Sequence, residues 1–99
     1  MKLKDIAHSR TGDKGDTAVL SLIAYREVDY PLLKERVTAE VVAEYFRDIV
    51  SGEVVRYELD SIYALNFVLG HALGGGVTRS LAIDMHGKSL SSALLEMEI

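Results

Sequence analysis

The spacing of apolar residues between Thr38 and Leu59 constrains the fold most, because it changes from helical to extended within one short segment. Thr38 is a favourable helix N-cap, and Gly52 ends the helix. Between them, apolar residues recur at helical spacing, namely Val42, Tyr45, Phe46 and Ile49. The next segment, residues 53–59, alternates between an apolar and a charged face, as strands with one wet side do. The apolar positions are Val55, Tyr57 and Leu59, and the charged ones are Arg56 and Glu58. A helix followed directly by such a strand predicts helices packed against a sheet.

The other segments predict further strands and helices. Residues 3–8 suggest a short first strand, and residues 17–25 suggest a central strand that is apolar on both faces and covered by helices. The second of these runs also fits a buried helix with Asp16 as its N-cap. Pro31 suits the first turn of a helix that reaches about Arg36, and residues 64–69 and 79–85 predict two more strands. A last helix contains Leu90, Ala93, Leu94 and Met97. Because strands and helices are mixed, we expect an α+β sandwich with helices on one face of the sheet.

Composition excludes several classes of protein. At 99 residues the chain fits a single domain over 1–99, and a net charge of -4 without a basic run argues against nucleic acid as a partner. The chain has no cysteine, no signal peptide and no apolar run long enough for a bilayer, so we expect a soluble cytoplasmic protein without a membrane partner. An apolar content of 48% is high for so small a domain. We therefore expect another subunit to cover part of its surface.

The stretch HSRTGDKGD, residues 8–16, is the first candidate site. Gly12 and Gly15 let backbone N–H groups turn toward a ligand, and Arg10, Lys14 and His8 supply polar side chains around them. The order of residues does not match a P-loop. We predict no cofactor.

A purely structural interpretation of this stretch stays open. In it, Asp13 caps its own backbone within a tight turn and Arg10 pairs with an acid. A metal site formed by His8, Asp13 and Asp16 is disfavoured, because Lys14 lies among those ligands and the acids lack the spacing of a calcium loop. We predict no metal.

A second polar cluster follows in residues 66–80. It contains Asn66, His71, the run Gly74 to Gly76, Thr78, Arg79 and Ser80. Three consecutive glycines suit a sharp turn or a close approach to a ligand, and equally a disordered hairpin tip. Asn66 lies in an otherwise apolar segment, where a buried amide needs hydrogen-bond partners. It serves either to hold a loop or to contact a substrate.

Three of these segments together resemble a known family. HSRTGDKGDT (8–17), ALNFVL (64–69) and ALGGGVTRSL (72–81) are similar, in order and spacing, to the small C-terminal domain of the acyclic-terpene-utilisation AtuA-like proteins. The resemblance runs over nearly the whole chain. It implies a ferredoxin-like two-layer sandwich with one mixed sheet. In that family the domain follows a much larger one, in proteins linked to terpene catabolism through CoA thioesters.

This chain departs from the family pattern because it begins at Met1, a few residues before the first motif, without the much larger domain. We expect either a separate large AtuA-like chain as partner, for which this is the small subunit, or a module that works alone or as a homo-oligomer. The leading hypothesis is a site for an acyl-CoA or carboxylate-type substrate. In it His8 or Asp13 is the acid or base. The substrate-binding groups are Arg10, Gly12, Lys14, Gly15, Asn66 and Arg79. The competing hypothesis is a non-catalytic oligomerisation or scaffolding domain whose glycine loops are structural.

Overall fold

A computed structural model describes residues 1–14, 17–47, 50, 52–70 and 90–99. The side chains of Asp13 and Lys14 lie outside the described part, although their backbone belongs to a strand. Four strands and three helices make up most of these residues, together with short 3₁₀ turns. The strands are β1 (Ala7–Lys14), β2 (Thr17–Ala24), β3 (Val54–Leu59) and β4 (Ala64–Leu69). The helices are α1 (Tyr30–Arg36), α2 (Ala39–Tyr45) and α4 (Leu90–Leu95).

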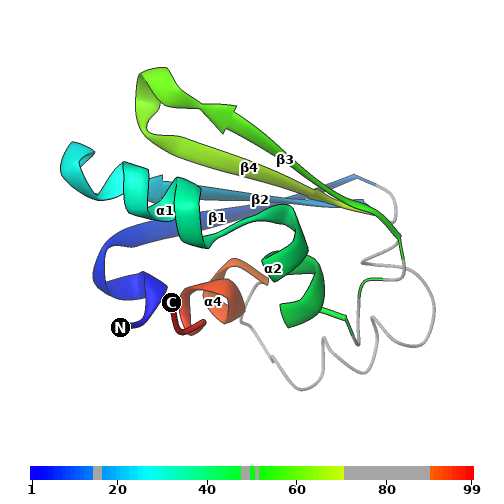
Figure 1. Cartoon of the computed structure of the whole chain (residues 1–99). Helices are drawn as coiled ribbons and strands as arrows, with labels where there is room; N and C mark the ends of the chain where they lie inside the picture. The colour runs from blue at the N-terminus through cyan, green and yellow to red at the C-terminus, as the bar shows by residue number, and fades with distance from the viewer. Residues whose placement is uncertain (15–16, 48–49, 51, 71–89) are drawn as a thin grey trace.

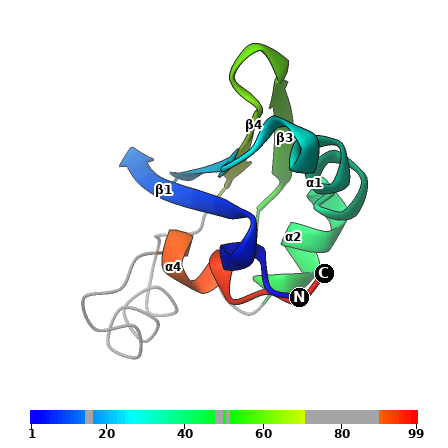
Figure 2. The ribbon, with the colours of Figure 1, turned by 90° about the vertical axis from the view of Figure 1, so that its left-hand side faces the viewer.

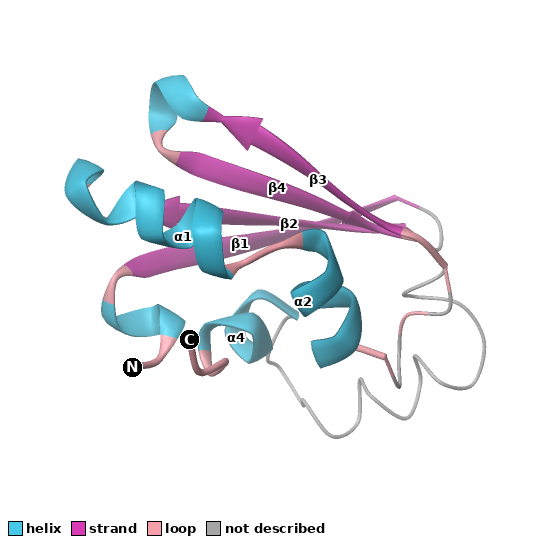
Figure 3. Cartoon of the chain, viewed as in Figure 1, coloured by secondary structure: helices cyan, strands magenta, loops and turns pink. Residues whose placement is uncertain are grey.

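The strands form one four-stranded sheet in the order β1-β2-β4-β3. All three of these helices lie on the same side of it (Figure 1; Figure 3), and the described residues place no helix on the other side. The α+β sandwich expected from the sequence is therefore confirmed. Every described pair of neighbouring strands is antiparallel, so the mixed sheet that the resemblance implied does not appear in these residues.

The core lies between the sheet and the helices. Alternate residues of β2 are buried, beginning with Ala18, and β4 contributes Leu65, Phe67 and Leu69 to the same layer. From the helices, Leu33, Val42 and Leu94 pack into this cluster. Burying apolar side chains on one face only is what an antiparallel sheet with a single helical layer requires.

Local signals explain two of the helices. The Thr38 side chain accepts a hydrogen bond from the Val41 amide at 3.1 Å, which caps α2 as predicted. Pro31 lies in the first turn of α1, where its missing N–H costs no helical hydrogen bond. Both helices begin where the sequence indicated, although α2 ends at Tyr45, well before Gly52.

The start of the chain differs from its prediction. Leu3–Asp5 form a 3₁₀ turn instead of a strand, and the strand begins at Ala7 and continues through Lys14. The termini lie side by side (Figure 2), because the Leu3 amide donates to the Met97 carbonyl at 3.0 Å. Most of the predicted HSRTGDKGD loop is thus part of a strand, since the backbone of β1 pairs with β2 along its whole length.

Two strands face differently from what the sequence suggested. Residues 17–24 form the predicted strand, yet helices cover only one of its faces, and its burial alternates strictly. In β3, Arg56 pairs with Phe67 and Glu58 with Leu65, so these charged residues share the helix side of the sheet with core residues. The apolar residues Val55, Tyr57 and Leu59 consequently lie on the side without helices. The predicted alternation of two faces is present, but the charged residues lie on the helix side of the sheet and the apolar ones on the open side.

Candidate functional site

Strand β1 places the first polar cluster on the uncovered face of the sheet. Ala7 is fully buried toward the helices, so the alternating residues His8, Arg10 and Gly12 point to the opposite side, and all three are exposed. A Cβ added at Gly12 would meet nothing within 4 Å, which means that the space above it is open. Three of the predicted site residues therefore line one edge of an open surface.

Asn66 lies on the same face, and the strand register relates it to Arg10. Arg10 pairs with Ser21 of β2, Ser21 pairs with Asn66 of β4, and Asn66 pairs with Tyr57 of β3. These four residues form one row across the sheet, which we call the polar row. Since neighbouring strands are about 4.8 Å apart, Arg10 and Asn66 are separated by roughly 10 Å of backbone. The structure thus brings Arg10 and Asn66 to one surface but not into contact.

The side-chain oxygen of Asn66 is the unusual atom of this row. Its Oδ1 is shielded from solvent and has no hydrogen-bond partner among the residues that the structure describes. Leaving a buried acceptor unpaired costs about 1–3 kcal/mol.

Two further features bound the face at the β1 edge. The His8 ring stacks on the Tyr25 ring with 5.2 Å between their centroids, which fixes the imidazole over the end of β2. On the helix side of β1, the Thr11 hydroxyl accepts a hydrogen bond from the Ser91 amide at 2.8 Å. The same strand therefore anchors α4 on one side and presents polar groups on the other.

Several predicted site residues cannot be located in this way. Gly15 and Arg79 lie outside the described residues, as do the Gly74 to Gly76 run and the side chains of Asp13 and Lys14. The predicted meeting of the two glycine-rich segments stays a prediction for the same reason.

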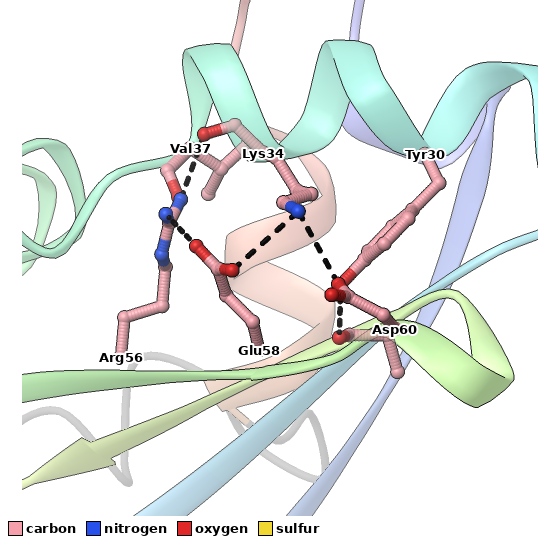
Figure 4. Close-up of polar contacts among 7 residues, drawn as sticks. Tyr30, Lys34, Val37, Arg56, Glu58 and Asp60 are labelled. Carbon is pink, nitrogen blue, oxygen red and sulfur yellow. Dashed lines mark hydrogen bonds and ion pairs between the residues drawn. The ribbon is translucent and has the colours of Figure 1, made fainter.

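A second candidate, which the sequence did not single out, is an open groove of about 650 Å³ between α1 and the end of the β3-β4 hairpin. The Tyr30 hydroxyl lies 2.6 Å from Asp60 Oδ1 and 3.1 Å from the Ala64 carbonyl, both of which are acceptors. Lys34 Nζ is 3.3 Å from Asp60 Oδ1 and 3.4 Å from Glu58 Oε1 (Figure 4). Lys34, Glu58 and Asp60 of this groove are therefore already paired with one another.

Arg56 completes the groove from strand β3. Its guanidinium donates to the carbonyls of Lys34 and Val37, at 2.8 and 3.0 Å, and to Glu58 Oε2 at 2.7 Å. The two carbonyls belong to the end of α1, where helical acceptors lack partners within the helix. Arg56 thus fastens α1 to the sheet edge, and the groove is best understood as the structural joint between them.

The titration behaviour of the groove fits this interpretation. Burial, followed by the hydrogen bond to Asp60, raises the pKa of Tyr30, so the phenol stays neutral. The hydrogen bonds from Tyr30 and from Lys34 lower the pKa of Asp60. A neutral phenol that donates to a carboxylate is a stable arrangement with no group poised to exchange a proton near neutral pH.

Local spacing gave no signal for this joint, because Tyr30 and Asp60 are thirty positions apart. In the described ranges no group of three or more histidine, aspartate or glutamate side chains is placed to hold a metal ion. None of the described helices is long and apolar enough to cross a membrane.

The geometry defines a class of protein: an α+β domain with one antiparallel sheet, helices on one face, and a polar row on the open face. The model of the AtuA ferredoxin-like domain family matches residues 1–99, which is the whole chain. The chain belongs to this family, and the resemblance read from its three motifs is confirmed. Searches of curated proteins and of solved structures found no match.

Proposed function

We propose that this chain is a small subunit or module of an AtuA-like assembly and that its open sheet face holds a carboxylate-type group of the substrate. The observation that carries the proposal is the placement of Arg10 and Asn66 in one row of that face. A guanidinium can bind a carboxylate through two parallel N–H donors, and the Asn66 amide supplies a further polar contact nearby.

The neighbouring residues suit an acyl-CoA or related acid. His8 is exposed at the same edge and is the candidate acid or base. Gly12 keeps the surface beside Arg10 low, so that a ligand can approach the strand closely. In this proposal Asp13, Lys14, Gly15 and Arg79 complete the site from the adjoining segments. The process served is the catabolism of acyclic terpenes or related acids.

Ligand binding by the purified chain tests this proposal. We would titrate it with a short acyl-CoA and with the corresponding free acid by calorimetry, comparing wild type with Arg10→Met. Loss of a charge-assisted pair predicts roughly tenfold to hundredfold weaker binding. Arg36→Met is the matched control, because Arg36 is also exposed but lies at the end of α1, on the helix side of the sheet.

The outcomes separate the two hypotheses drawn from the sequence. Weaker binding in Arg10→Met alone supports the carboxylate site. Equal binding in wild type and Arg10→Met would remove Arg10 from the site. Absence of binding by any variant, with a stable assembly, would favour a scaffolding domain.

A further inference from the structure

The open face of the sheet is more apolar than a solvated face should be. Its half-buried aliphatic residues are Val19, Ile23, Val55, Leu59 and Val68. Tyr57 projects among them with 55% of its surface exposed. A sheet with helices on one side ordinarily turns polar residues to water on the other. Among the described side chains of this face, Arg10 carries the only permanent charge. Such depletion of charge is typical of the core of a protein interface.

We infer that a second copy of this chain covers the open face, related to the first by a two-fold axis that runs parallel to the strands between β2 and β4. This inference shares the surface of the proposed function and names its partner. A two-fold axis in that direction places β1 over β3 of the second copy and β2 over β4. It leaves each residue at the same height along the strands. Two sheets stack in this aligned way about 10 Å apart, with strands within about 30° of each other.

The polar row becomes complementary to itself under this operation. Its order is Arg10, Ser21, Asn66, Tyr57, and the axis reverses the order in the second copy. Ser21 then faces Asn66 of the second copy, so that two half-buried polar side chains meet at the centre of the face. Arg10 faces Tyr57 of the second copy, over whose ring a guanidinium is attracted.

The flanking row that contains Gly12 is complementary in size. Gly12 faces Val55 of the second copy, so that a large side chain meets the position without one, and Val19 faces Val68 at the centre of the same row. Interdigitation of this kind forms the core between stacked sheets.

The alternative two-fold axis, perpendicular to the strands, is less favourable. It places β1 over β1, and where it crosses the polar row Arg10 meets Arg10, so that two like charges come together at an interface. The parallel axis instead keeps the two Arg10 side chains at opposite edges of the dimer. Stacking on a tyrosine also leaves the in-plane N–H groups of the guanidinium free for a carboxylate, so in the dimer the proposed site keeps Arg10 at the edge, while Asn66 and Gly12 face the second copy.

Crosslinking tests the axis directly, because the chain contains no cysteine and any introduced one is unique. Gly12→Cys and Val55→Cys chains, carrying tags of different size, are mixed and treated with a short bismaleimide. The parallel axis predicts that the mixture gives crosslinked dimers and that either variant alone gives few. Strong crosslinking of Gly12→Cys alone would overturn the parallel axis.

Sedimentation equilibrium gives the second, independent readout. Wild type is expected to have twice the mass of the 10.9 kDa chain at micromolar concentration, and Tyr57→Glu is expected to be a monomer. Val28→Glu is the control, since Val28 is 72% exposed outside the sheet and should leave the dimer intact. A monomeric wild type would overturn the inference, even if calorimetry still showed Arg10-dependent binding. A dimer with the predicted crosslinks but no ligand binding would support the inference and count against the proposed carboxylate site alone.

Discussion

Asn66 of β4 lies directly opposite Ser21 of β2, yet no described residue donates a hydrogen bond to the shielded Oδ1 of Asn66. The aliphatic residues that surround these two polar residues are unexpected if that face simply meets water. They are explained if each meets its counterpart in a second copy. Variants at the centre of the open face therefore test most directly whether a second copy covers it.

A double-mutant cycle on this pair is the first prediction. Asn66→Leu removes an unpaired acceptor, so it should leave the monomer as stable as wild type or slightly more so, while weakening the dimer. Ser21→Ala should weaken the dimer as well. Dimer dissociation constants of the two single variants and the double variant should show a coupling of about 0.5–1.5 kcal/mol. Strictly additive effects would mean that the two side chains do not meet.

Arg56 should be hard to replace even by lysine. Lysine keeps the charge but cannot donate to the Lys34 and Val37 carbonyls and to Glu58 at once, because it lacks the planar fork. We expect Arg56→Lys to lower the free energy of unfolding by about 1–3 kcal/mol in urea titrations. Arg36→Lys, at an exposed position, should change it by less than about 0.5 kcal/mol. Equal effects would show that α1 does not depend on Arg56.

Tyr30 makes stability depend on pH at the alkaline end. Its pKa is raised in the folded state above the ordinary value of 10.0, chiefly by burial. The neutral phenol therefore contributes stability that is fully present below about pH 10 and lost as pH rises further. Tyr30→Phe should cost about 1 kcal/mol at pH 7 and flatten the decline between pH 10 and 12. Urea unfolding at several pH values measures both. Tyr25→Phe, at a tyrosine with 63% of its surface exposed, is the control variant.

Thr11 should matter for stability although its neighbours on β1 matter for binding. Thr11→Val removes the acceptor of the Ser91 amide while keeping the shape of the side chain, and we expect a loss of about 1 kcal/mol. Thr11→Ser keeps the hydroxyl and should restore most of it. Thermal unfolding provides the comparison, and indistinguishable Thr11→Val and Thr11→Ser proteins would contradict this role.

The sequence predicted those elements whose signals are local. The N-cap at Thr38, the proline in α1 and the alternation of residues 54–59 act within a few positions of the chain. It missed that residues 8–14 form a strand, because glycines and charges there indicated a turn while pairing with β2 decides the conformation. It also misplaced Arg56 and Glu58, since alternation separates two faces without saying which one meets the helices.

The candidate site could be predicted only in part for the same reason. His8, Arg10 and Gly12 share a face because they alternate along one strand, which the sequence allows but does not require. Asn66 joins them through the strand order β1-β2-β4, a long-range arrangement that no local pattern encodes. The joint between Tyr30 and Asp60 likewise exists only after folding.

Solvent accessibility of the open face is the most direct test of our central claim. Methyl groups of Val19, Val55 and Val68 can be followed by NMR with a soluble paramagnetic agent in dilute and concentrated samples. If a second copy covers the face, their relaxation by the agent falls as the protein concentration rises. The relaxation of Val28, which is 72% exposed and lies outside the sheet, stays constant. Unchanged relaxation of all four valines across the concentration range would contradict it.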